Sequence, residues 1–407
     1  MRKKDWVRLG LCAAVLFWRP SLAKPNPDVV ITVQTIAALR ALPQNGQFST
    51  VNVAGYFTVS DGGGGLFNWN SSSTTQDDGG IVINPSGHRG RGRYVRQDAQ
   101  SSAYSPYWFG ARGDGKTDDY AAWDRTVVAA RNASQRAVLC PQGVFILGSV
   151  PLDVSGVSIQ GISSIGCVLK RGSRATGQYT VKLDGSGPGG ASRMSYRNFQ
   201  IDGNRSSNPN ENWGLGLIGN AIDNLFEDIQ IRETKTGGLR LRLDSSARPS
   251  VNTFINLQVL DSSGKGVEID AGRNLHFQGL DIELVDGIGL DISGQDESPG
   301  RIIVENFWIE KTGDGNIDAI RIAGYSDRVT LAYGNVQDYG NNAGTQGSGI
   351  SIPAGRHVRL RGLDISPRNG RSIARHRKIA VGSSSRSITI EDHGFVPTDI
   401  EDNSSEK

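Results

Sequence analysis

One short pattern recurs along the second half of the chain, and it limits the folds that the chain can adopt. A tetrapeptide that ends in isoleucine or valine returns every 23 to 30 residues. Its copies, NFQI, DIQI, NLQV, GLDI, NFWI, YGNV and a second GLDI, end at Ile201, Ile231, Val259, Ile282, Ile309, Val336 and Ile365. A second apolar segment, usually opened by glycine, follows each copy. Repeats of about 20 to 50 residues are typical of solenoids and arrays.

Within each repeat, polar and apolar residues alternate at period two, which is typical of a strand with one buried face. In the first GLDI copy, Leu280, Ile282 and Leu284 alternate with Asp281 and Glu283. Two or three such strands per repeat fit one coil of a parallel β-helix. A leucine-rich repeat has a comparable period, but its fixed asparagine and its leucine spacing are missing. The sequence therefore predicts an all-β solenoid in which every coil adds strands to the same sheets.

The segment that precedes the repeats resembles a known family. The residues YWFGARGDGKTDDYAAWDRTVVAARN, from Tyr107 to Asn132, resemble the opening of pectate-lyase-superfamily domains, found in secreted polysaccharide-degrading enzymes and phage tailspike depolymerases. The resemblance implies a right-handed parallel β-helix with an N-terminal capping helix, preceded by a small β-rich module. Amphipathic spacing over residues 120–131 predicts that helix, with Thr117-Asp118 supplying its N-cap.

Three carboxylates in this segment, Asp114, Asp118 and Asp119, invite interpretation as a metal or catalytic cluster. Aspartate is also favoured at helix caps and in tight turns, where its oxygens accept hydrogen bonds from backbone amides. We therefore expect these residues to be structural.

The chain divides into four regions. Residues 1–23 read as a signal peptide, with a basic start, a short apolar core from Leu9 to Phe17, and small residues near Ala23. Residues 24–104 are the small β-rich module, residues 105–396 the β-helix, and residues 397–407 a polar tail that we expect to be disordered. No other apolar run approaches the length of a membrane span. We expect a secreted or periplasmic bacterial protein.

Charge and cysteine content narrow the choice of partners. The 44 basic and 41 acidic residues are close to balance, so neither nucleic acid nor a membrane is expected as a partner. In an oxidising compartment Cys140 and Cys167 could form a disulfide, and two buried thiols fit the sequence equally well.

The period-two register defines a solvent-facing side for the repeated strand. If the last residue of each tetrapeptide faces the core, the residues on either side of it face outward. The outward pairs are Gln200 and Asp202, Gln230 and Arg232, Gln258 and Leu260, Asp281 and Glu283, Trp308 and Glu310, Asn335 and Gln337, and Asp364 and Ser366. Acid concentrates in the middle coils. Because neighbouring strands lie about 4.8 Å apart, Glu283 should lie beside Glu310, with Asp281 diagonal to it.

Paired carboxylates at this spacing are what glycoside hydrolysis requires, one as acid and one as nucleophile or base. We therefore predict Asp281, Glu283 and Glu310 as catalytic residues. We expect the substrate to be bound by the apolar ring of Trp308, by the cation of Arg232 if the sugar carries an anionic substituent, and by Asp202 as one further acid. Three amides would bind hydroxyl groups of the sugar: Gln230, Gln258 and Asn335. The competing interpretation is solvated surface decoration, since charged residues populate most surfaces. Like charges stacked on adjacent rungs repel each other, which favours a functional role.

The outward residues of the second strand form a control. They are Arg240, Glu268, Asp291, Arg321 and Ser351. Charges of both signs are interspersed along this ladder, which predicts structural ion pairing.

Three functions remain open from the sequence. The leading one is a secreted glycoside hydrolase that cleaves a polysaccharide or oligosaccharide without a cofactor. The second is a polysaccharide lyase, in which Asp281, Glu283 and Glu310 would bind calcium; no basic residue clearly occupies the middle rungs to act as its base. The third is a glycan-binding or assembly module without catalysis, and a homotrimer is compatible with the tailspike resemblance.

Overall fold

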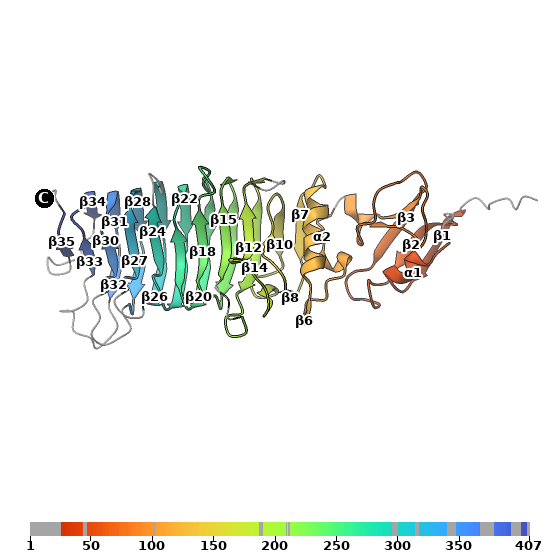
Figure 1. Cartoon of the computed structure of the whole chain (residues 1–407), viewed down its shortest axis with the longest axis horizontal. Helices are drawn as coiled ribbons and strands as arrows, with labels where there is room; N and C mark the ends of the chain where they lie inside the picture. The colour runs from red at the N-terminus through yellow and green to blue at the C-terminus, as the bar shows by residue number, and fades with distance from the viewer. Residues whose placement is uncertain are drawn as a thin grey trace, which may run out of the picture.

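The computed structural model describes residues 26–43, 47–100, 102–186, 190–208, 210, 212–294, 300–313, 317–339, 347–366, 378–391 and 400–404. The chain forms an elongated rod, with a small β-rich module at one end and stacked coils running to the C-terminus (Figure 1). The proposed signal peptide, residues 1–23, lies outside the described residues. Among the described residues, no helix is both long and apolar enough to cross a membrane.

The N-terminal module is a five-stranded sheet in the order β1-β2-β3-β5-β4, with a short helix beside it. Its elements are β1 (Asn26–Val33), α1 (Ile36–Arg40), β2 (Phe48–Val53), β3 (Gly65–Asn70), β4 (Val82–Ile83) and β5 (Arg93–Arg96). A separate small core holds the sheet and helix together, built from Ile36, Leu39, Val51, Val53, Phe67, Ile83 and Tyr94.

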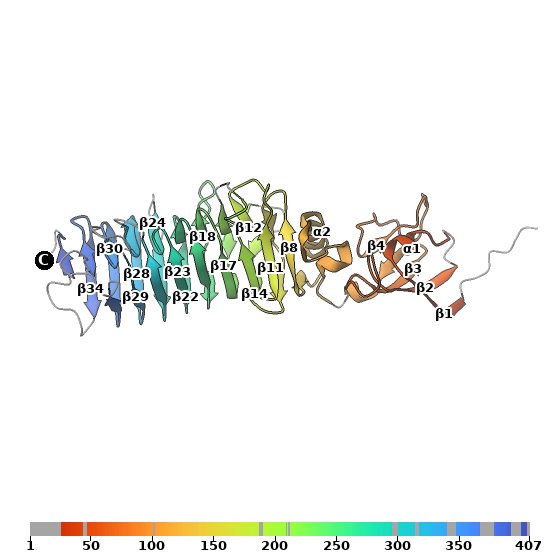
Figure 2. The ribbon, with the colours of Figure 1, turned by 90° about the horizontal axis from the view of Figure 1, so that it is seen from below.

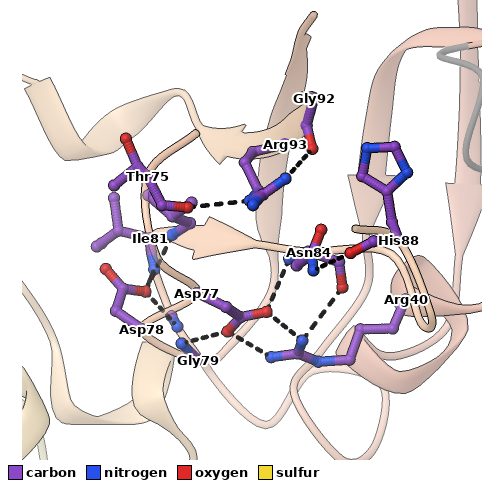
Figure 3. Close-up of polar contacts among 12 residues, drawn as sticks. Arg40, Thr75, Asp77, Asp78, Gly79, Ile81, Asn84, His88, Gly92 and Arg93 are labelled. Atoms are coloured by element: carbon purple, nitrogen blue, oxygen red, sulfur yellow. Dashed lines mark hydrogen bonds and ion pairs between the residues drawn. The ribbon is translucent and has the colours of Figure 1, made fainter. Parts of the chain in front are cut away.

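Two adjacent aspartates organise the loop between β3 and β4 (Figure 3). Asp77 forms an ion pair with Arg40 and accepts from the backbone amides of Gly79 and Asn84 at 2.9 and 2.7 Å. Oδ1 of Asp78 accepts from three successive backbone amides, residues 80 to 82, at 2.8 to 3.0 Å. Hydrogen bonds that satisfy otherwise orphaned amides give these carboxylates a structural role.

Arg96 links the module to the solenoid. Its side chain is buried, and its guanidinium lies 4.6 Å from the ring of Phe67 in the module and 4.6 Å from the ring of Trp108. Its nitrogens donate to backbone carbonyls, including that of Gly63 at 2.7 Å. A buried guanidinium with satisfied donors fixes both surfaces that pack on it.

The solenoid begins with η2 (Pro106–Phe109), β6 (Asp114–Asp118) and α2 (Tyr120–Arg131), which covers the end of the coils (Figures 1 and 2). Trp123 of α2 is fully buried against Phe145, with ring centroids 5.4 Å apart. The predicted helix bounds are confirmed, but the N-cap residue is Asp119 rather than Thr117 or Asp118, and its side chain does not cap the helix.

The three aspartates at this end are structural, as predicted. Asp114 accepts from the amides of Lys116 and Thr117, at 2.9 and 2.7 Å. Asp119 accepts from the amides of residues 112 and 113, and Asp118 from those of residues 120 and 148.

About nine coils follow, and their strands stack into three parallel faces. The first face, here called the carboxylate face, contains β8 (Gly143–Leu147), β11 (Cys167–Arg171), β14 (Ser195–Asp202), β17 (Leu225–Arg232), β20 (Gln258–Ser262), β23 (Asp281–Val285), β26 (Trp308–Thr312), β29 (Asn335–Gln337) and β32 (Asp364–Ser366). The second, the ion-pair face, contains β9 (Leu152–Asp153), β12 (Tyr179–Asp184), β15 (Trp213–Ile218), β18 (Gly237–Arg242), β21 (Lys265–Ile269), β24 (Leu290–Gly294), β27 (Ile320–Gly324), β30 (Ile350–Ile352), β33 (Ile379–Val381) and β35 (Ile400–Asp402).

The third, the arginine face, precedes the carboxylate face within each coil. It contains β7 (Ala137–Cys140), β10 (Ser158–Gly161), the first halves of β14 and β17, β19 (Thr253–Ile255), β22 (Arg273–Gln278), β25 (Gly300–Glu305), β28 (Ser326–Ala332), β31 (Gly355–Arg361) and β34 (Arg386–Glu391). Two short strands, β13 (Ala191–Ser192) and β16 (Ala221–Ile222), pair at an edge.

The predicted register is confirmed, because every tetrapeptide ends in a buried residue. Ile201, Ile231, Val259, Ile282, Ile309, Val336 and Ile365 are at most 2% exposed. Aromatic rings stack along the same core: Tyr196, Phe226, Phe254 and Phe277 follow one another with centroids 5.0, 4.7 and 4.4 Å apart. Each coil therefore buries its apolar residues against the matching residues of its neighbours.

Two sequence expectations are settled at the ends of the solenoid. Cys140 and Cys167 form a disulfide, which joins the first two coils through β7 and β11. The polar tail is ordered in part, contrary to prediction: residues 400–402 form β35, which pairs in parallel with β33. Backbone pairing to an otherwise open sheet edge outweighs the polar composition there.

Candidate active site on the carboxylate face

Three carboxylates and an indole meet on two neighbouring rungs, β23 and β26. Glu283 pairs in register with Glu310, and Asp281 pairs with Trp308. Because neighbouring strands lie about 4.8 Å apart, Glu283 faces Glu310 along the rod, and Asp281 lies diagonally from Glu310. An isoleucine separates the two members of each outward pair and is fully buried, so both members point to the solvent side.

Asp281 and Glu283 both retain protons more readily than ordinary carboxyls. Burial raises the pKa of Asp281, and the charge of Glu310 raises it further, against the opposing effect of a hydrogen bond from Gln258. That bond reaches Oδ2 at 3.1 Å, whereas Oδ1 is buried without a partner among the described residues. Burial also raises the pKa of Glu283, and the charges of Asp281 and Glu310 add to the effect.

Glu310 has the opposite tendency. Lys311 Nζ contacts Glu310 Oε1 at 2.6 Å, and Trp308 Nε1 donates to Oε2 at 3.0 Å. The hydrogen bond from Lys311, followed by that from Trp308, lowers the pKa of Glu310. Two facing carboxylates, Glu283 and Glu310, therefore have pKa values that are displaced in opposite directions, which is how acid and base roles are separated in active sites.

Period-two alternation does not predict Lys311 as a site residue, because it turns the residue after Glu310 toward the core. The backbone of Lys311 is left-handed, with φ of 51°, where the coil bends from one face to the next. Leu284 occupies the same corner with φ of 58° and is 46% exposed, so its predicted inward direction is wrong. A left-handed residue interrupts the pleat, so two successive side chains can point outward.

The predicted amide ligands form a chain that ends at the acids. Gln230 Nε2 donates to Gln258 Oε1 at 3.0 Å, and Gln258 in turn donates to Asp281. Gln200, on the preceding rung, is only 7% exposed. The chain fixes the orientation of the Asp281 carboxylate.

The remaining predicted ligands lie on the same face but make other contacts. Arg232 contacts Asp261 at 3.5 Å rather than the acid cluster. Asp202 contacts Lys170 at 3.2 Å and accepts from the amide of Asn204 at 2.7 Å, as a turn residue does. Asn335 lies beside Trp308, and its Oδ1 is buried without a partner in the described part of the chain.

The ion-pair face differs from the carboxylate face on the same coils. Arg240 contacts Glu268 and Asp270 at 2.9 and 2.7 Å, and Asp291 contacts both Lys265 and Arg321 at 2.6 and 2.7 Å. The predicted structural ion pairing is confirmed. Glu268 and Asp291 are in addition almost fully buried, which the outward register alone did not predict.

The described residues contain no group of three or more His, Cys, Asp or Glu side chains placed to share a metal ion. The two described histidine–carboxylate contacts, His276 with Glu305 and His357 with Asp327, are pairs at 2.8 Å on the arginine face.

Two family models match parts of the chain. One, described as a phage tail protein small four-stranded beta-sheet domain, matches residues 32–99, and one described as a right-handed beta helix region matches residues 142–309. The solenoid is a right-handed parallel β-helix. No curated protein sequence matches the chain.

The β-helix is shared with solved phage tailspikes. The enzymatically active domain of tailspike protein 2 from bacteriophage CBA120 has 18% identity and a TM-score of 0.66, covering 90% of this chain and 52% of that one. The tailspike gp42 of Acinetobacter phage vb_AbaP_AS12 has 15% identity and a TM-score of 0.63, covering 89% and 63%. Tailspike gp49 of Acinetobacter baumannii bacteriophage Fri1, described as a capsular polysaccharide depolymerase, has 14% identity and a TM-score of 0.59, covering 90% and 76%. The chain thus spans about half of the first of these proteins.

Proposed function

We propose that this β-helix protein cleaves a polysaccharide by hydrolysis, with Glu283 as proton donor and Glu310 as the ionised nucleophile or base. The observation that carries the proposal is the pair itself: two carboxylates on adjacent rungs whose pKa values are displaced in opposite directions. Several of the tailspikes with this fold are described as enzymatically active or as depolymerases, which supports a polymeric glycan substrate.

Each side chain has a definable part in this chemistry. Glu283 keeps its proton to higher pH and can deliver it to the leaving glycosidic oxygen. Glu310 is held ionised by Lys311 and Trp308, so it can attack the anomeric carbon or activate water. The charge of Asp281 contributes to the raised pKa of Glu283. Trp308 is 40% exposed and presents an apolar ring face to a sugar.

The spacing of the rungs favours retention of configuration. Retaining glycosidases hold their two carboxyl groups about 5 to 5.5 Å apart, and inverting enzymes about 6.5 to 9.5 Å apart. Directly paired residues on adjacent strands start from a separation of about 4.8 Å, nearer the retaining value. The diagonal pair Asp281 and Glu310 would be about 8 Å apart by the same strand geometry, nearer the inverting value.

A lyase is the second candidate, and Lys311 is the observation that raises it, because it supplies the basic residue in the middle rungs that elimination requires. The hydrogen bond with Glu310 raises the pKa of Lys311, however, which keeps the amine protonated and unable to accept a proton. The electrostatics of the pair therefore favour hydrolysis.

The test is a polysaccharide panel in which reducing ends and ultraviolet absorbance are read together. Hydrolysis produces reducing ends without absorbance, and elimination produces an unsaturated, absorbing product. Glu283→Gln and Glu310→Gln should each lower kcat by roughly a thousandfold or more, because each removes a group that acts in the transition state.

The matched control is Glu227→Gln, which removes a glutamate of the arginine face that contacts Arg197 at 3.1 Å. It should retain wild-type activity. Full activity in both Glu283→Gln and Glu310→Gln would place the chemistry on another face. An absorbing product would establish the lyase.

A further inference from the structure

An exposed tyrosine stands on the ridge between the arginine face and the carboxylate face, one coil beyond the acids. Tyr333 is 51% exposed and has a left-handed backbone with φ of 54°, which is unusual for a bulky residue. Its amide donates to the carbonyl of Arg361 at 2.9 Å, and its ring lies over Gly362, where even a Cβ would come within 3.0 Å of the ring. The same corner is left-handed in other coils, as at Asn256 and Asn306, so the conformation belongs to the repeat and the exposed ring is what sets this coil apart.

The ridge is close to the proposed active site. Asn335 pairs with Trp308 on the neighbouring rung, and Tyr333 precedes Asn335 by two residues. With strands about 4.8 Å apart and alternate residues of a strand about 6.7 Å apart, the Cα atoms of Tyr333 and Trp308 are at most about 8 Å from each other, because the corner shortens the extended span. Two exposed aromatic side chains on neighbouring coils can contact neighbouring sugar units of one polymer.

A guanidinium completes the ridge. The Arg361 side chain lies over the Tyr333 ring, 5.4 Å from its centroid. A planar guanidinium that stacks on a ring still presents its N–H groups at its edge, where they can bind a carboxylate with two parallel hydrogen bonds. Tyrosine and arginine together thus offer an apolar plane and an anion-binding edge.

Two described carboxylates lie close to Arg361 along the chain or across the sheet: Asp364 belongs to the carboxylate face, in register with Asn335, and Glu391 belongs to the arginine face. Glu391 lies opposite Arg361 in register but contacts Arg359 at 3.2 Å. Asp327, at the start of the neighbouring strand β28, contacts Arg328 and His357, each at 2.8 Å. No described carboxylate forms an ion pair with Arg361, so its guanidinium edge is open to an anionic ligand at the ridge.

We propose that Tyr333 and Arg361 form a subsite for a negatively charged sugar unit, and that the substrate is consequently an acidic polysaccharide. The inference rests on the proposed function for its location, since the subsite adjoins the carboxylates that would cleave the chain. It adds the class of substrate. Uronate carboxylates and sulfate esters share the required anionic chemistry, and the planar edge of Arg361 suits both.

The test measures binding separately from cleavage. Glu283→Gln protein is run through gels that contain alginate, hyaluronan, dextran sulfate or neutral dextran. The acidic polymers should retard migration and dextran should not. Tyr333→Ala and Arg361→Gln should each weaken binding by about tenfold, the loss expected for one charge-assisted or stacked contact. Retardation by the carboxylate polymers alone, or by dextran sulfate alone, identifies which anion the subsite takes.

Two control variants have matched chemistry elsewhere on the rod. Tyr325→Ala removes a 50% exposed tyrosine at another corner of the same coil, and Arg328→Gln removes an exposed arginine of the neighbouring strand. Both should bind the acidic polymers as the parent does. Equal losses in the controls, equal retardation by dextran, or no binding to any acidic polymer would overturn the subsite. A change of oligomeric state caused by Tyr333→Ala would also overturn the subsite, because the ridge would then be a contact between copies of the chain.

The outcomes separate this inference from the proposed function. Acidic polymers that bind through Tyr333 and Arg361, with no cleavage of any polysaccharide, would retain the subsite and remove the hydrolase. A neutral polysaccharide that is cleaved in a Glu283-dependent reaction would retain the hydrolase and overturn the subsite.

Discussion

Asp281 and Asp291 belong to the same coil, ten positions apart in the sequence, yet the protein treats them in opposite ways. On the ion-pair face, burial alone would raise the pKa of Asp291, but hydrogen bonds from Arg321 and Lys265 lower it below the ordinary value. On the carboxylate face, burial raises the pKa of Asp281 and the nearby Glu310 adds to the rise. Two aspartates of one coil thus have opposite environments: cations contact Asp291, whereas the nearest charge that acts on Asp281 is the carboxylate of Glu310.

The difference separates structural charge from charge available for chemistry. A stacked solenoid brings every outward residue to within about 4.8 Å of its equivalents, so like charges on neighbouring rungs repel unless a cation lies beside them. On the ion-pair face Glu268 and Asp291 are neighbours, and Lys265 contacts both of them. A ladder that keeps like charges together gives up stability, and groups held in that condition can react or bind ligands.

The largest expected effect is a loss of stability when the ion pairs of Asp291 on the ion-pair face are removed. Asp291→Asn leaves Lys265 and Arg321 around a neutral residue, and removing one member of a buried ion pair typically costs about 3 to 5 kcal/mol. Urea unfolding at neutral pH should show this loss in the free energy of unfolding. Because the folded-state pKa of Asp291 is lowered, the wild-type advantage exists above the unfolded pKa and disappears as pH falls through the folded value. A loss below 1 kcal/mol would mean that the ladder is not structural.

The second prediction concerns Lys311. Lys311→Gln removes the cation that lowers the pKa of Glu310, so that pKa should rise. Glu310 must be ionised to act, so the acid limb of the pH–activity profile should move to higher pH. The charge of Lys311 also lowers the pKa of Glu283, so the basic limb should move to higher pH as well, but by less, because Lys311 has only a minor effect there. Arg197→Gln, which removes a cation of the arginine face that contacts Glu227, is the control. An unmoved acid limb would dissociate Lys311 from the reaction.

The third prediction concerns the opposite limb. Asp281→Asn removes a negative charge that raises the pKa of Glu283, so that pKa should fall. The proton donor is then lost at lower pH, and the basic limb of the profile should shift downward. If Asp281 rather than Glu283 is the proton donor, the variant loses kcat across the whole pH range. The anomeric configuration of the wild-type product then distinguishes an inverting from a retaining reaction.

The smallest expected effect is a gain in stability. Glu283→Gln removes the repulsion between residue 283 and Glu310 on the adjacent rung. A cross-strand pair of like charges lowers the free energy of unfolding by roughly 0.5 kcal/mol. The variant should therefore unfold at slightly higher urea at neutral pH. Because the folded-state pKa of Glu283 is raised, the gain should vanish as pH falls below the unfolded value, where the wild-type carboxyl is protonated in both states. A loss of stability would contradict the interpretation of this ladder as repulsive.

The sequence alone predicts the register of the strands, because period-two alternation shows which residues face the core and the recurring tetrapeptide shows which residues are neighbours on adjacent coils. Once Ile282 and Ile309 face the core, Glu283 and Glu310 must be neighbours. The corner residues could not be predicted in this way: the left-handed backbone of Lys311 is set by the path between two sheets, and it defeats a rule that assumes a continuous pleat. Polar composition likewise gave the wrong prediction for residues 400–402, where an open sheet edge decides.

The covalent link between Cys140 and Cys167 makes the two ends of the rod unequal. Coils of a solenoid touch only their neighbours, so melting can begin at either terminus and advance one layer at a time. At the N-terminal end, the first two layers are tied together and α2 covers them. Among the described coils, loosening should therefore begin in the layers farthest from this link. Tyr333 and Arg361 lie in coils nearer to these layers than Glu283 and Glu310 do. Moderate warming should therefore abolish binding of the polymer at Tyr333 and Arg361 before it disturbs the carboxylate pair.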